Sequence, residues 1–96
     1  MSGKIEGTIV SVSDDGDLIT DIEFPSWNSA PGDSSVRIVV DDEHETFGVF
    51  PSTHDQPVMT LIAIGDKDHP LRLSLVGDSA SMMLGVRAGA PVRMVW

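Results

Sequence analysis

The spacing of short apolar runs constrains the fold of this chain more than any other feature. Runs of five to nine residues, rich in β-branched side chains, alternate with turns rich in Gly, Pro, Asp and Ser. Such runs are short for helices and have the composition of strands. The runs that we interpret as strands are residues 5–13, 18–22, 36–40, 45–50, 58–64, 71–75 and 91–95. About seven strands at this spacing predict an all-β fold, a small closed Greek-key-like barrel, because closing the sheet removes its exposed edges.

The turns between these runs predict the local connections. Gly16 is free to take a positive φ, so the first two runs should form a hairpin, and the polar residues 41–44 should join the third run to the fourth. We expect residues 24–33, which are rich in Pro, Ser, Asn and Gly, to be a long mobile loop. The most continuous apolar run, 58–64, is expected to be buried on both sides.

One short helix is predicted near the C-terminus. Asp78 or Ser79 can cap residues 80–84, and Gly85 can end the helix in the left-handed conformation. We expect the two methionines of this helix to fill the core.

Length and composition indicate a single domain, residues 1–96, with one modest core. The chain contains no cysteine, so neither disulfides nor zinc–thiolate clusters can reinforce that core, and a cytoplasmic location is expected. The N-terminus lacks the apolar region of a signal peptide, and no apolar stretch approaches the roughly 20 residues that cross a bilayer.

The charge is strongly asymmetric. The net charge is −9, with eleven acidic and two basic residues before Val49 and four of each from Val49 onward. An acidic surface repels phosphate backbones and anionic lipids, so we expect neither nucleic-acid nor membrane partners. The acidic half is either a solvated face or a docking face for a basic partner.

No set of residues predicts a catalytic or metal site. Each of the three histidines lies beside a turn, and no two have metal-ligand spacing. The aspartates around Gly16 match a fragment of a calcium loop, but its distal glutamate is missing, which favours a solvated turn. Nucleophile elbows and phosphate-binding glycine patterns are also absent, so we expect no catalytic residues and no enzyme activity from this chain alone.

Tryptophans are the less usual side chains. Trp27 lies in a polar segment, where it either stacks on a ligand or partner or folds back to cover the barrel. Trp96, at the C-terminus, is expected to close one end of the barrel.

Two segments resemble one known family. Residues 7–22 are similar to the opening of the C-terminal domain of the S-adenosylmethionine hydroxide adenosyltransferases, fluorinases and chlorinases, where a strand leads into a Phe-Gly-Asn-Leu-x-Thr-Asn-Ile hairpin. Residues 73–92 resemble the Leu-Gly-x-x-x-Gly-x-x-Val ending of that domain. The family's Phe and adenine-contacting Asn correspond here to Asp15 and Asp17. Similar hairpin and helix motifs occur in other small barrels, including molybdate-binding modules.

The resemblance implies a barrel that contributes adenine contacts to an S-adenosylmethionine site, shared in the family with the catalytic domain of a neighbouring subunit in a trimer. An ionised Asp17 can accept a hydrogen bond from an adenine amino group but cannot donate one to a ring nitrogen. The residues that we expect to bind a ligand are Asp17, Trp27, Lys67, Asp78 and Ser79.

Three functions follow as hypotheses. The first is a stand-alone non-catalytic module that binds a nucleoside-like small molecule, such as S-adenosylmethionine or adenosine, or a protein partner. The second is one half of a split S-adenosylmethionine hydrolase that acts with a separate catalytic chain. The third is a structural oligomerisation domain, for which a trimer is one expectation.

Overall fold

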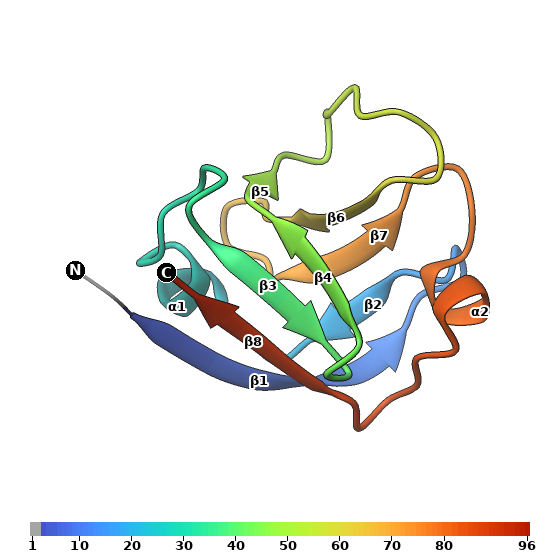
Figure 1. Ribbon diagram of the computed structural model, residues 1–96, viewed down its shortest axis with the longest axis horizontal. Helices are drawn as coiled ribbons and strands as arrows, with labels where there is room; N and C mark the ends of the chain where they lie inside the picture. Colours follow the sequence, from blue (N-terminus) through green and yellow to red (C-terminus); the bar gives the residue numbers. More distant parts are fainter. Residues whose placement is uncertain (1–2) are drawn as a thin grey trace.

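The computed structural model describes residues 3–96 as an eight-stranded sheet rolled into a nearly closed barrel, with two short helices (Figure 1). Residues 1–2 lie outside the described residues. They belong to the N-terminal stretch in which we expect no signal peptide. The strands are β1 (Lys4–Val12), β2 (Leu18–Thr20), β3 (Arg37–Val40), β4 (His44–Phe47), β5 (Val49–Phe50), β6 (Leu61–Ile64), β7 (Arg72–Leu75) and β8 (Pro91–Val95). The helices are α1 (Phe24–Trp27) and α2 (Ala80–Leu84). The predicted all-β barrel is confirmed.

The sheet turns one corner within β1. Its strand order is β4-β3-β8-β1-β2-β7-β6-β5. The first part of β1, from Lys4 to Thr8, pairs with β8, and the second part, from Ile9 to Val12, pairs with β2. The register shifts between Ile9 and Ser11, and such a bulge bends a strand and increases its twist. One long strand thereby belongs to both halves of the barrel.

The second corner lies at Gly48, between β4 and β5. Gly48 has φ +82°, a left-handed conformation that a glycine adopts without steric cost. On one side β4 runs antiparallel to β3, and on the other β5 runs parallel to β6. The Thr46 hydroxyl donates a 2.7 Å hydrogen bond to the Leu61 carbonyl oxygen, which ties β4 to β6. Chain continuity and this side-chain bond therefore link the two edges of the sheet.

The core fills the barrel interior as the alternation predicts. Leu71, Leu73 and Leu75 all point inward and are buried, as are Ile9 and Leu18 of the first hairpin. The largest fully buried side chains are Ile9, Leu18, Thr20, Val36, Ile38, Val40, Ile62, Leu71, Leu73, Val86, Val92 and Met94. Trp96 packs half-buried against this cluster, in agreement with its expected place at one end of the barrel.

The loop predicted at residues 24–33 contains helix α1, so that prediction was partly wrong. Pro25 lies in the first turn of the helix, where its fixed φ and missing N–H are tolerated. Trp27 is buried, packs edge-on against Phe24 with ring centroids 5.1 Å apart, and donates its Nε1–H to the His69 carbonyl oxygen at 2.8 Å. Of the two readings of Trp27, the structure supports the one in which it covers the barrel.

The strand predicted at residues 58–64 is buried on both sides only at its end, where Ile62, Ala63 and Ile64 are all buried, and the prediction for the methionines of the short helix was wrong. Strand β6 begins at Leu61, because Met59 takes φ +69° and ends the extended conformation before it. Val58 and Met59 are exposed rather than buried in a strand. The methionines of α2, Met82 and Met83, are also exposed, because the helix is only five residues long and packs against the barrel through Ala80.

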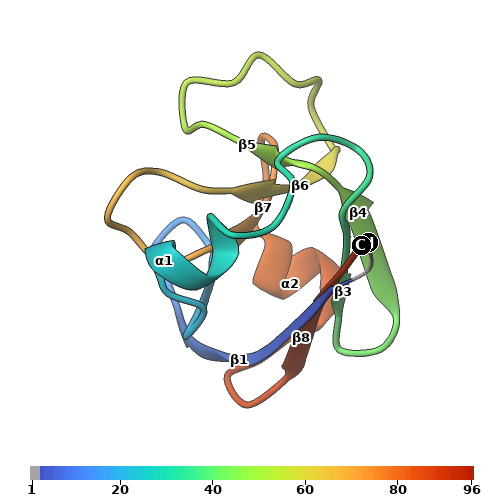
Figure 2. The ribbon, with the colours of Figure 1, turned by 90° about the vertical axis from the view of Figure 1, so that its left-hand side faces the viewer.

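The two helices lie at opposite ends of the barrel (Figure 1), and a view from the α1 side shows α2 behind α1, below β7 and above β1 (Figure 2). Among residues 3–96, neither helix has the length and hydrophobicity required to span a membrane.

Candidate functional site

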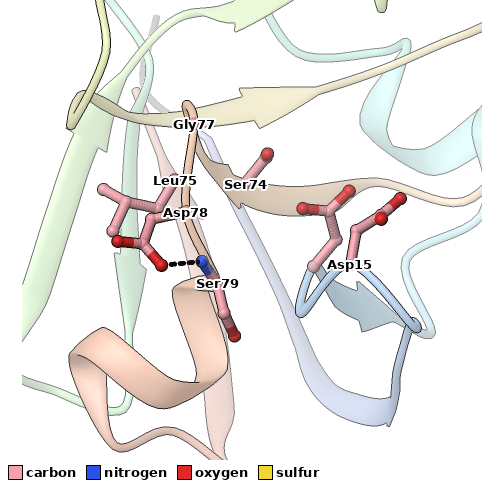
Figure 3. A pocket seen from close by; sticks show the side chains of 7 residues that line it. Asp15, Ser74, Leu75, Gly77, Asp78 and Ser79 are labelled. Atoms are coloured by element: carbon pink, nitrogen blue, oxygen red, sulfur yellow. Dashed lines mark hydrogen bonds between the residues drawn. The ribbon is translucent and has the colours of Figure 1, made fainter.

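A cleft of about 440 Å³ opens at the α2 end of the barrel, between the β1–β2 turn and the segment that joins β7 to α2 (Figure 3). It is lined by Asp15, Asp17, Ser74, Leu75, Gly77, Asp78 and Ser79. Its volume lies within the range of roughly 300–1,000 Å³ that is usual for small-molecule sites.

One wall of the cleft is the tight turn between β1 and β2. Ser13 holds this turn together: its amide donates to the Asp17 carbonyl at 2.9 Å, its carbonyl accepts from the Gly16 amide at 2.9 Å, and its hydroxyl accepts from the Asp17 amide at 3.0 Å. Gly16 occupies φ +87°, as predicted from its place in the turn. The turn therefore presents Asp15 and Asp17 from a fixed backbone.

The opposite wall is the start of α2. The Ser79 hydroxyl accepts a hydrogen bond from the Met82 amide at 3.2 Å, which is the predicted N-cap, and the Asp78 carboxylate accepts from the Ser79 amide at 2.7 Å. Gly85 ends the helix at φ +69°, also as predicted. Both Asp78 and Ser79 are thereby held at the mouth of the cleft.

Gly16 joins the two walls. Its carbonyl oxygen accepts a hydrogen bond from the Ser81 amide at 3.0 Å. A Cβ atom at this position would lie 2.7 Å from the Cα of Ser79, closer than real Cβ contacts come. Only a glycine allows the hairpin to dock this closely on α2, so Gly16 sets the width of the cleft.

The cleft is acidic. Three of its seven lining residues are aspartates, and the cation Arg72 lies beside it, with its Nε 3.7 Å from the Asp17 carboxylate. No group of three or more potential metal ligands is found among residues 3–96, so these carboxylates do not converge on one point. The surface therefore favours a ligand with a positive charge or with several hydrogen-bond donors.

Two carboxylates outside the cleft, Glu6 and Asp33, have a lowered pKa. The hydrogen bond and charge of Lys4 lower the pKa of Glu6, and hydrogen bonds from the side chain and backbone of Ser35 lower the pKa of Asp33. Both side chains are exposed, so the lowered pKa values reflect local contacts at the surface.

The structure brings together three of the five predicted site residues. Asp17, Asp78 and Ser79 line the cleft. Trp27 and Lys67 do not line it. Lys67 is exposed in the turn before β7, whereas the cleft lies at the other end of that strand. The Trp27 indole donates its hydrogen bond to His69, in the same turn as Lys67. The predicted single binding face is thus divided between two ends of the barrel.

Four lining residues were not predicted as ligand-binding: Asp15, Ser74, Leu75 and Gly77. The outward position of Ser74 follows from the alternation of Leu73 and Leu75, and Asp15 belongs to the same turn as Asp17. Ser74 and Asp15 could therefore have been predicted as lining residues from the sequence, given that the β1–β2 turn lies beside β7.

Comparison with known proteins supports the fold. The sequence matches no protein-family model and no curated protein. Among solved structures, the crystal structure of an uncharacterized conserved protein from Thermotoga maritima matches 95% of this chain with a TM-score of 0.77 and 23% sequence identity. The chain spans 35% of the length of that protein. At this identity the likeness concerns the barrel fold alone.

Proposed function

We propose that this chain is a non-catalytic binding module whose acidic cleft holds a nucleoside-like ligand, with S-adenosylmethionine or adenosine as the expected compounds. The observation that carries the proposal is that Asp17, Asp78 and Ser79, which the sequence predicted as ligand-binding, line one cleft of small-molecule size.

The chemistry of the lining supports such a ligand. The carboxylates accept hydrogen bonds and would pair with an exocyclic amino group, an ammonium or a sulfonium. Ser74 and Ser79 supply hydroxyls that can donate as well as accept. Their hydroxyls have no histidine or lysine beside them in the described lining, which favours binding over nucleophilic chemistry.

Calorimetric titration with S-adenosylmethionine and with adenosine tests the proposal. We expect one site for each, and we expect D17N/D78N to weaken S-adenosylmethionine binding by about tenfold or more, because the ligand's positive groups lose two carboxylate partners. Adenosine, which is uncharged, should lose less. D55N, which removes an exposed carboxylate outside the cleft, is the matched control and should leave both affinities unchanged. Absence of heat with both ligands at millimolar concentration would refute the proposal.

A second candidate function is one half of a split S-adenosylmethionine hydrolase. It is favoured by the fraction of the Thermotoga maritima protein that this chain spans, since a similar barrel there belongs to a much longer chain. A separate catalytic chain, mixed with this one, should then consume S-adenosylmethionine, while neither chain does so alone. An oligomerisation role, with a trimer as the expected state, would instead give a trimeric mass in light scattering.

A further inference from the structure

Four exposed apolar side chains belong to two segments that contact residues of the cleft. Val58, Met59, Met82 and Met83, which we call the apolar rim, are 69%, 51%, 83% and 54% exposed. Met82 and Met83 donate their amides to the hydroxyl and carbonyl oxygens of Ser79, and Val58 packs over Gly77. Each side of the rim therefore rests on residues that line the cleft.

The rim is held in place by the backbone. Met59 adopts φ +69°, a left-handed conformation that is uncommon for residues other than glycine, and its amide donates to the Val76 carbonyl oxygen at 2.7 Å. Unfavourable backbone conformations persist where the surrounding structure imposes them, and they cluster at functional sites. The Val58–Met59 segment is thus tied to Val76, next to the cleft, in a backbone conformation that has a cost.

The two turns that form the cleft walls carry only acidic charges, and the nearby Arg72 is paired with Asp17. Asp14, Asp15 and Asp78 are exposed in the two turns that form the cleft walls. A surface that covers the rim would bury or approach these carboxylates, so it must supply basic groups next to its apolar side chains.

A second copy of this chain meets that requirement poorly. Of its six basic side chains, four already lie within 4 Å of a carboxylate: Lys4, Arg37, Arg72 and Arg93. The net charge of −9 would also oppose association of two copies through their acidic faces.

We propose that the apolar rim is a docking surface for a separate protein that presents apolar side chains flanked by Lys or Arg. The apolar contacts replace water at the rim, and the basic groups pair with the turn carboxylates. The four apolar side chains lie outside the residues that line the cleft, whereas two of the carboxylates that would pair with the basic groups, Asp15 and Asp78, belong to that lining. The apolar part of the docking surface can therefore be tested without the nucleoside-like ligand.

Peptide titration, followed by ¹⁵N–¹H spectra of the full chain, tests the proposal with defined probes. The first probe is an amphipathic helical peptide of Leu and Lys; a Leu/Glu peptide and a Lys/Ser peptide test the need for basic and for apolar groups. We expect only the Leu/Lys peptide to bind tightly and to shift the amides of the rim. M82S/M83S should weaken that binding by about tenfold or more. F47S removes an apolar side chain on β4 that is 49% exposed, and it should change the binding less than about twofold.

Three outcomes would overturn the proposal. In the first, the Leu/Lys peptide fails to bind or is bound equally by M82S/M83S and F47S. In the second, the Lys/Ser peptide binds as well as the Leu/Lys peptide, which would show that charge alone drives binding. In the third, sedimentation shows a wild-type oligomer that M82S/M83S dissociates, and the rim is then covered by a second copy. Melting curves establish that the variants are folded, which is expected because both methionines are exposed.

Discussion

Substitution of Gly16 by alanine tests how the hairpin and α2 build the cleft. The left-handed conformation at φ +87° costs an L-residue about 1–2 kcal/mol. The new methyl group would also meet the Cα of Ser79 at 2.7 Å, and a backbone atom cannot move aside by a change of rotamer. Overpacking of this kind costs about 1–3 kcal/mol. We therefore expect G16A to lower the free energy of unfolding by about 2–5 kcal/mol in all.

Two other glycines separate the conformational cost from the packing cost. Gly85 and Gly89 have φ +69° and +97°, on either side of the Gly16 value, and a Cβ atom at either would meet nothing within 4 Å. G85A and G89A should therefore show only the conformational cost. In urea unfolding, G16A should be about 1–3 kcal/mol less stable than either control, and its Tm lower by about 4–8 °C for each kcal/mol. Equal stability of all three variants would refute the close docking of the hairpin on α2.

The remaining predictions concern the bond between β4 and β6 and the two tryptophans. Thr46→Val should lower the free energy of unfolding in urea by about 1–3 kcal/mol, because the Leu61 carbonyl oxygen loses its hydrogen-bond donor. Thr46→Ser keeps the bond. An equal loss of stability in both variants would contradict the role of this bond in joining β4 to β6. Gly3→Ala should red-shift Trp96 fluorescence, because a Cβ there would overlap the indole, and an unchanged spectrum would count against this packing. Trp27→Phe should lower Tm, because the variant loses packing and the Nε1 hydrogen bond to His69. The adenosine affinity should stay unchanged, because α1 and the cleft lie at opposite ends of the barrel. A lower affinity would show that Trp27 contributes to ligand binding.

Most of the fold was predictable because local chemistry decides it. The alternation of Leu71, Leu73 and Leu75 sets the inward face of β7, and Ser79 and Gly85 set both ends of α2. Helix α1 was missed because its four residues lie in a segment with the composition of a loop, and the helix is stabilised by the burial of Trp27 against the barrel. That burial is a tertiary contact, which composition does not reveal.

The site was predictable only in part, for a related reason. Asp17 and Asp78 lie 61 positions apart, and they share a cleft because the β1–β2 turn docks on the start of α2 through Gly16. Lys67 was grouped with them, but β7 separates its turn from the cleft. The residue types suggest which side chains could bind a ligand, whereas the arrangement of the strands determines which of those side chains lie in the same cleft.

Mapping of amide shifts during an adenosine titration of ¹⁵N-labelled protein locates the ligand directly. If the nucleoside enters between the hairpin tip and α2, the largest changes will fall on residues 15–17 and 74–79. A response centred on the turn that holds Lys67, or a spectrum that adenosine leaves untouched, would contradict the assignment of the binding site to this end of the barrel.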